Sequence, residues 1–154
     1  MKKFFVLAGS ILLSAVAFAF NNTGDVNEKV LQSFRSGFPH AEEVSWEELP
    51  KSYVVNFTDD MVRTKIIYQK NGEFVSSTRY YTEHTLPSYL RLLIKKEYPG
   101  KEIFGVTEIS AVTDEENHIE TLYYIKLTDA RHWITIRMES DGTITEKEKL
   151  NRSL

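Results

Sequence analysis

Two stretches of the sequence decide its fold: residues 53–72 read YVVNFTDDMVRTKIIYQKNG, and residues 123–142 read YYIKLTDARHWITIRMESDG. In both stretches apolar residues alternate with polar ones, and both end in the dipeptide Asn-Gly or Asp-Gly. Alternation with a period of two predicts β-strands that bury one face, and these dipeptides are strong signals for hairpin turns. Each stretch therefore predicts two antiparallel strands, and its final dipeptide predicts a turn that leads to a further strand.

The two stretches belong to a longer internal repeat. Tyr53 corresponds to Tyr123, 70 positions later, whereas the Phe-Pro pair at 38–39 corresponds to the Tyr-Pro pair at 98–99, 60 positions later. The ten additional residues fall around 113–118, a segment rich in Asp, Glu and Asn that predicts a longer hairpin loop. Similarity at a fixed spacing indicates a duplicated structural unit.

Each copy of the repeat opens with a helical pattern. In the second copy Leu86, Leu90 and Ile94 recur at the spacing of one helix face. Thr85 precedes them as the expected N-cap, and Pro87 is expected in the first turn, where its missing amide proton costs nothing. The first copy carries the same apolar stripe, so we expect one helix at the start of each copy.

We therefore predict an α+β fold in which a helix followed by four antiparallel strands occurs twice. The two units form one curved sheet with the helices on one face. The first unit is expected over residues 20–84 and the second over residues 85–154, together making one compact tandem domain. A unit of this size is small for independent stability, so each is expected to depend on its neighbour.

Residues 1–19 predict a signal peptide. Lys2 and Lys3 precede an uncharged apolar stretch, and Ala17-Phe18-Ala19 is a small-x-small cleavage site. The apolar stretch is shorter than the roughly 20 residues that a membrane-spanning helix needs, which favours cleavage over a stable membrane anchor. The chain contains no cysteine, which excludes lipid attachment at the new N-terminus, a disulfide scaffold and a thiolate metal site. We expect a periplasmic or secreted protein.

A set of turn and core positions is shared with a known family. It comprises the string Phe38-Pro39-x-Ala41-x-x-Val44-x-Trp46, the helix start Leu86-Pro87, the helix end Tyr98-Pro99-Gly100, and the hairpin glycines Gly72 and Gly142. In these positions the chain resembles the PepSY-like family of exported bacterial proteins, which is also described as similar in fold to the β-lactamase inhibitor protein.

The similarity to this family runs from Val26 to about Lys149. The second copy departs from it, with Gly105 and Val106 where the first copy carries the Trp46 motif. The resemblance implies a tandem α+β fold, export, and an inhibitory or binding role. It implies no catalytic residues.

Charge and motifs exclude several classes of function. The formal charge is −3, or −5 once Lys2 and Lys3 are removed, and the basic residues are scattered, which argues against a nucleic-acid partner. The chain has no G-x-S-x-G motif, and its four histidines lack metal-ligand spacing. We expect the chain to have no metal site, no cofactor and no enzymatic activity. Carboxylates from different strands can meet in space, so a carboxylate-based hydrolase is an alternative.

The candidate site is the sheet face turned away from the helices. If Ile125 and Ile136 are buried, strand alternation turns their neighbours to the open face, where Thr, Lys, Glu and Ser are expected. Phe104 and Val106 are expected on the buried face. Large side chains on the open face mark a candidate partner-binding set: Tyr124, Trp133, Leu122, Tyr81 and Arg137. The alternative is that these side chains form cross-strand pairs that only stabilise the sheet.

We therefore expect an exported, non-enzymatic module that binds a protein or peptide in the cell envelope. The family resemblance adds the inhibition of a periplasmic or secreted hydrolase. The other alternative is a carrier that holds a small apolar ligand between sheet and helices, in a cavity lined by Trp46, Phe57 or Tyr68.

Overall fold

The computed structural model describes residues 26–113 and 117–152. The signal peptide predicted over residues 1–19 and the centre of the predicted long loop, 114–116, lie outside the described residues. In chain order the elements are α1 (Glu28–Gly37), β1 (Glu42–Glu48), β2 (Ser52–Asp59), β3 (Val62–Gln69), β4 (Phe74–Tyr81), a short 3-10 helix η1 (Glu83–Thr85), α2 (Ser88–Glu97), β5 (Glu102–Thr113), β6 (His118–Thr128), β7 (His132–Glu139) and β8 (Ile144–Asn151).

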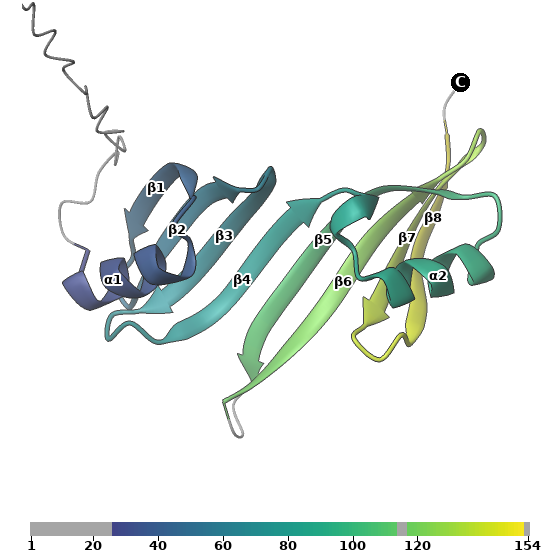
Figure 1. Cartoon of the computed structure of the whole chain (residues 1–154). Helices are drawn as coiled ribbons and strands as arrows, with labels where there is room; N and C mark the ends of the chain where they lie inside the picture. The colour runs from purple at the N-terminus through teal and green to yellow at the C-terminus, as the bar shows by residue number, and fades with distance from the viewer. Residues whose placement is uncertain (1–25, 114–116, 153–154) are drawn as a thin grey trace, which may run out of the picture.

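The strands form one open antiparallel sheet in which strands that follow each other in the chain are also neighbours in space, from β1 to β8. Both helices lie on the same side of this sheet, α1 over its first strands and α2 over its last (Figure 1). A helix followed by four antiparallel strands therefore occurs twice, and the predicted α+β fold is confirmed.

The first core forms beneath α1. Phe34 is 2% exposed, and its ring packs edge-on against Trp46 at 5.3 Å and against Phe57 at 5.0 Å between ring centroids. Tyr68 stacks on Trp46 at 6.5 Å. Of the three rings expected to line a ligand cavity, Trp46 and Phe57 thus pack against the helix, and Tyr68 packs against Trp46.

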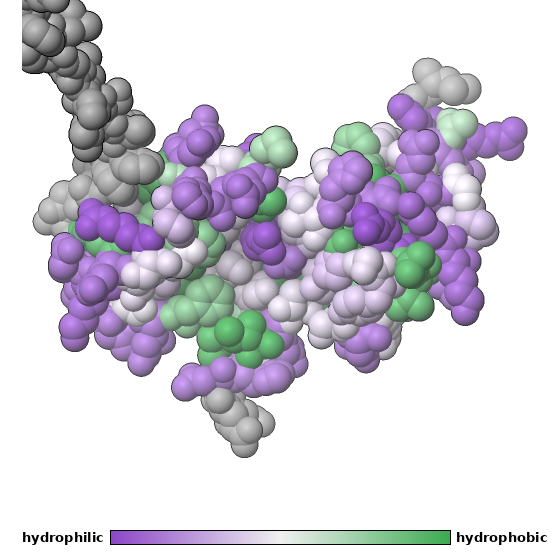
Figure 2. All heavy atoms as spheres, viewed as in Figure 1, coloured by the Kyte–Doolittle hydropathy of each residue, from purple (hydrophilic) through white to green (hydrophobic). Residues whose placement is uncertain are grey.

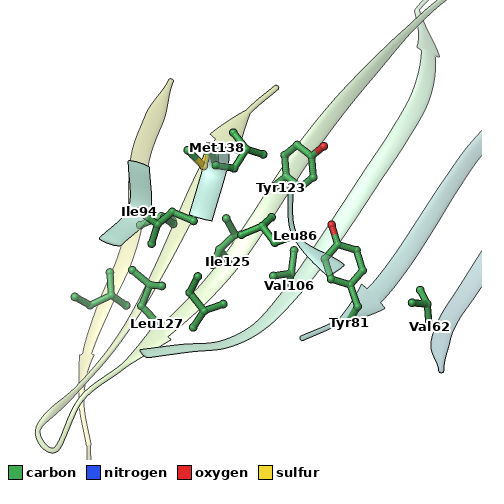
Figure 3. Close-up of a cluster of buried hydrophobic side chains, with 13 residues drawn as sticks. Val62, Tyr81, Leu86, Ile94, Val106, Tyr123, Ile125, Leu127 and Met138 are labelled. Carbon is green, nitrogen blue, oxygen red and sulfur yellow. The ribbon is translucent and has the colours of Figure 1, made fainter. Parts of the chain in front are cut away.

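The second core forms beneath α2 and contains the apolar residues that were expected to face inward. Leu90 and Ile94 pack on Ile125, Leu127 and other fully buried side chains of β6 and β7 (Figure 3). Val62 of β3 and Tyr81 of β4 belong to the same cluster. This core therefore draws side chains from both halves of the chain.

The start of α2 differs from the prediction. The helix begins at Ser88 with Pro87 in the N-cap position, and no side chain caps it. Leu86, which precedes the proline, is extended with φ −64° and ψ 134°, as the proline ring favours. That extended residue separates Thr85 from the helix, so the prediction of Thr85 as the cap was wrong.

The two hairpin glycines have the same structural role in both halves. Gly72 and Gly142 have φ of +96° and +95°, values in the left-handed region that favours glycine. A Cβ on Gly142 would also lie 2.6 Å from Cδ1 of Leu93 on α2. The turn between β7 and β8 thus lies close against the helix.

Candidate functional site

The open face of the sheet is identified by the burial pattern of β6 and β7. In β6, Tyr123, Ile125 and Leu127 are buried, whereas Tyr124 is half-buried and Lys126 is exposed. The same alternation runs along β7, where the isoleucines and Met138 are buried. Leu122, Tyr124, Trp133 and Arg137 therefore lie on the face away from the helices, as predicted.

Tyr81 is not on the open face, so its predicted placement on that face was wrong. Its side chain is 8% exposed and packs in the second core with Val62 and Val106 (Figure 3). The physical reason is a bulge in β4: the pairing with β3 skips Val75, which shifts the alternation of the strand by one residue. Tyr80, 44% exposed, occupies the open face in its place.

Trp133 is surrounded by open-face side chains. The Phe104 ring meets its indole edge-on at 5.0 Å. The Lys126 ammonium lies 4.6 Å and the Arg152 guanidinium 5.2 Å from its ring centroid. Such contacts hold a large aromatic side chain in a fixed position while leaving it partly exposed.

Phe104 is a member of this surface that the sequence pattern placed on the buried face. It is 61% exposed, whereas Ile103 and Val106 on either side are buried. The pairing of β5 with β6 skips Phe104 between Ile103 and Gly105, so a second bulge turns its ring outward. Gly105 within a strand was the one available signal, since glycine in a strand often marks a bulge.

Arg137 and Leu122 sit farther along the open face. Arg137 pairs across the strands with Tyr124, and its guanidinium forms an ion pair with Glu139 at 3.0 Å. Leu122 pairs with Glu139 on one side and with Ile109 on the other. These pairings bring Leu122, Tyr124 and Arg137 together, whereas Trp133 lies on the same face at the other end of β7. Tyr80 and Phe104 extend the surface.

Two pockets hollow the sheet near this surface. The larger, about 710 Å³, lies where the β2–β3 turn and the segment after β4 meet the open face of β5 to β7. Tyr80, Phe104, Tyr124 and Lys126 line it together with Gly105. The smaller pocket, about 360 Å³, adjoins it and shares Tyr80.

The helix side carries a polar network at the junction of the two halves. The Glu108 carboxylate accepts hydrogen bonds from the Tyr81 hydroxyl at 2.5 Å and from Arg79 at 3.1 Å. Burial, and then the bond to the Glu108 carboxylate, raise the pKa of Tyr81 far above its ordinary value of 10.0. Tyr81 is therefore a neutral structural donor at physiological pH.

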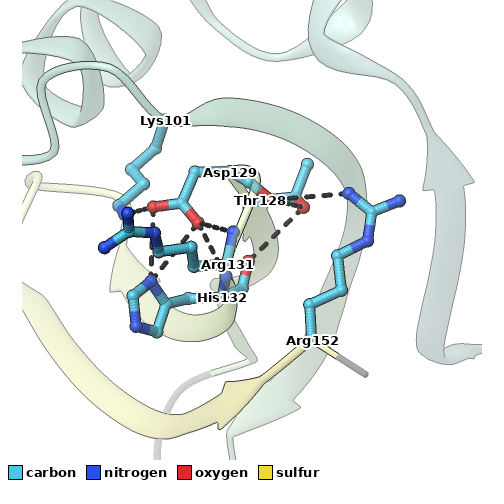
Figure 4. Close-up of polar contacts among 6 residues, drawn as sticks. All are labelled: Lys101, Thr128, Asp129, Arg131, His132 and Arg152. Carbon is cyan, nitrogen blue, oxygen red and sulfur yellow. Dashed lines mark hydrogen bonds and ion pairs between the residues drawn. The ribbon is translucent and has the colours of Figure 1, made fainter. Parts of the chain in front are cut away.

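A second polar cluster holds the turn between β6 and β7 (Figure 4). The Asp129 carboxylate accepts hydrogen bonds from the backbone amides of Arg131 at 2.7 Å and His132 at 2.6 Å, and it forms an ion pair with Lys101. The Lys101 ammonium and these amides hold the pKa of Asp129 well below its usual range. The Nδ1 atom of His132 lies 3.4 Å from Oδ2 of the same carboxylate.

The surface over the helices is largely hydrophilic (Figure 2). Figure 2 shows this side as two lobes separated by a notch, with hydrophilic side chains over much of both. Within residues 26–113 and 117–152, no three His, Asp or Glu side chains come together as a metal site. In the same part of the chain, no helix is long and apolar enough to cross a membrane.

Comparison with known proteins identifies the fold. No family model matches the chain, and no curated protein matches it. A BLIP-like protein from Bacteroides fragilis is similar in structure, with a TM-score of 0.57 and 11% sequence identity over 84% of this chain and 89% of that one. The fold is BLIP-like. This agrees with the expected likeness to the β-lactamase inhibitor protein, and no finding extends it to the PepSY-like family.

Two further structures are similar over almost the same range. One is a protein from Bacteroides eggerthii named for an expected periplasmic location, with a TM-score of 0.55, 15% identity, and coverage of 83% of this chain and 90% of that one. The other is a DUF2874 family protein from Bacteroides uniformis, with a TM-score of 0.54, 18% identity, and coverage of 81% and 88%. At such identities the likeness concerns the fold alone.

Proposed function

We propose that the open face of the sheet binds a protein or peptide partner in the cell envelope, and that the chain acts without catalysis. The observation that carries this proposal is the cluster of large side chains on a sheet face that neither of the two described α-helices covers. Trp133, Phe104 and Tyr124 lie there on neighbouring strands, where small polar residues are the expected occupants. Aromatic and Arg side chains are enriched at the energetic centres of protein interfaces.

The arrangement of these side chains supports binding further. Trp133 is held between the Phe104 ring and the cations of Lys126 and Arg152 before any partner arrives. A side chain that is already fixed loses little conformational entropy on association, so more of its contact energy appears as affinity. The alternative, that these rings only stabilise the sheet, does not account for the large exposed fraction of Phe104.

A finer proposal names the class of partner and the location. The BLIP-like fold and the sequence resemblance both support an inhibitor of a periplasmic or secreted hydrolase, with the open face covering the cleft of the enzyme. The B. eggerthii structure and residues 1–19 support export of the chain. No second function is proposed, because Trp46, Phe57 and Tyr68 pack within the first core, where a carrier would need space.

The test is capture of partners with the mature chain as bait in a periplasmic extract. Tyr124→Ser with Trp133→Ser should abolish the capture of partners that the wild-type chain retains. Leu92→Ser is the matched control, because Leu92 is 69% exposed on α2, on the opposite side of the sheet. Capture that survives the double substitution, or that Leu92→Ser abolishes, would contradict binding by the open face.

A further inference from the structure

The larger pocket has a volume and a lining suited to a side chain of a bound partner. Tyr80, Thr107, Tyr124 and Thr135 line it from open-face positions of successive strands. Val62, Tyr81 and Val106 of the second core also line it. Met61, in the β2–β3 turn, is 94% exposed at its border. Methionine, tyrosine and phenylalanine are side chains that interfaces favour, and about 710 Å³ lies within the range of ordinary ligand sites.

Gly105 lines this pocket in the middle of the sheet. It pairs with Lys126 on the open face, and its φ lies outside the left-handed region. A Cβ built on Gly105 would meet no atom within 4 Å. Neither backbone conformation nor crowding within the chain therefore requires glycine here, although glycine weakens a strand interior. Its absent side chain leaves room for a group from outside.

The charges around the pocket select the kind of group. Arg63 and Lys126 line it, and Lys65 lines the adjoining smaller pocket. Among the described residues, none of these three cations forms an ion pair with a carboxylate, whereas Arg137 nearby is paired with Glu139. Asp60 is the one carboxylate that lines the larger pocket in the described part of the chain. A chain of net negative charge thus presents, at this place, cations that form no ion pair with a carboxylate of the described residues.

We propose that the pocket at Gly105 receives a large apolar side chain from an acidic segment of the partner protein. The apolar group fills the space above Gly105 and between Phe104 and Tyr80, while flanking carboxylates pair with Lys126 and Arg63. The inference rests on the proposed function, since it presumes that the open face binds a protein. A purely anionic ligand would use the cations and leave the aromatic lining without a contact.

The experiment selects displayed random peptides on the immobilised mature chain and measures the affinity of the enriched peptides as synthetic molecules. Enriched peptides should carry net negative charge and a large apolar residue, and added salt should weaken their binding. Gly105→Leu fills the pocket and should reduce their affinity by roughly tenfold or more. Arg63→Glu with Lys126→Glu should reduce it similarly, and Leu92→Ser should leave it unchanged.

Each result separates this inference from the broader proposal. Enriched peptides that are basic or neutral, but still lose binding with Tyr124→Ser and Trp133→Ser, would overturn the acidic partner and keep the open face as a binding surface. The binding of alginate, an anionic polysaccharide, is measured with the same variants. If the chain binds alginate and enriches no peptides, the proposal of a protein partner is overturned. If no open-face substitution changes the affinity of the enriched peptides, both proposals are overturned. Urea unfolding and one amide NMR spectrum of each variant establish that it is folded.

Discussion

The Tyr81 hydroxyl on β4 donates a hydrogen bond of 2.5 Å to Oε2 of Glu108 on β5. These two strands meet where the first half of the chain joins the second, and Arg79 adds an ion pair to the same carboxylate at 3.1 Å. The Glu108 side chain is only 13% exposed. A carboxylate so far removed from water is stable only with such partners, so the three side chains act as a unit across the junction.

Glu108→Ala should destabilise the protein by about 1–3 kcal/mol, because it leaves the buried Tyr81 hydroxyl and the Arg79 guanidinium without their acceptor. The measurement is the free energy of unfolding in urea. Glu102→Ala on the same strand is the control, because Glu102 is exposed and a surface change should stay within about 0.5 kcal/mol. Equal effects of the two substitutions would show that the Glu108 network contributes nothing to stability.

Tyr81 should make the fold sensitive to alkali. Its folded pKa lies far above 10.0, first through burial and then through Glu108, so the unfolded chain loses the tyrosine proton at a lower pH than the folded chain. The stabilisation is complete below pH 10.0 and is lost as the pH rises above it. Tyr81→Phe should make the decline of stability above this pH shallower, without removing it, because burial also raises the pKa of Tyr68 and Tyr123. Identical declines in both proteins would contradict this assignment.

The sequence allowed the layout of the fold to be predicted because that layout depends on periodicity. The alternation around Ile125 and Ile136 and the turns at Gly72 and Gly142 are local signals, and the structure agrees with them. The same periodicity placed Tyr124 and Trp133 on the open face.

The two errors about which sheet face a side chain occupies have one physical cause, which is the β-bulge. The skipped residue Val75 reverses the alternation before Tyr81, and the skipped residue Phe104 turns its own ring outward. A bulge depends on the pairing between two strands, so alternation within one strand does not show it. The pocket beside Gly105 could not be predicted either. Five strands and two connecting segments contribute to it, and the alternation within one strand does not show how they come together.

Asp129 should give the protein a second, acid-sensitive element. Its folded pKa lies below the ordinary value of 3.8, chiefly through Lys101 and the amide of Arg131, so the ionised carboxylate stabilises the fold above that pH. This contribution is lost as the pH falls below 3.8 towards the folded pKa. Asp129→Asn should be less stable than wild type at neutral pH and should lose less on acidification. Lys101→Met should show a weaker form of the same change. The measurement is the free energy of unfolding as a function of pH, and parallel curves for wild type and Asp129→Asn would contradict a stabilising role of the ionised Asp129 carboxylate.

Tyr123 and Tyr124 provide a matched test of strand parity, because they are adjacent residues of the same type on opposite faces. Tyr123→Ser empties a place in the second core beneath α2 and should cost about 3–5 kcal/mol, as for other large aromatic truncations. Tyr124→Ser removes only cross-strand contacts with Thr107 and Arg137 and should cost less than about 1 kcal/mol. Urea unfolding measures both, and a larger loss for Tyr124→Ser would place that ring in the core and remove it from the binding surface.

Separating the two halves between η1 and α2 should destabilise the second half more than the first. The second core includes Val62 and Tyr81, which the cut removes, whereas the buried residues of the first core, from Val30 to Tyr68, all lie in the first half. The cut also exposes the paired edges of β4 and β5 and deprives Glu108 of its partners. The second half alone should show poorly dispersed amide NMR signals and no cooperative unfolding. Mixing the halves should restore both, and a second half that unfolds cooperatively by itself would contradict a shared core.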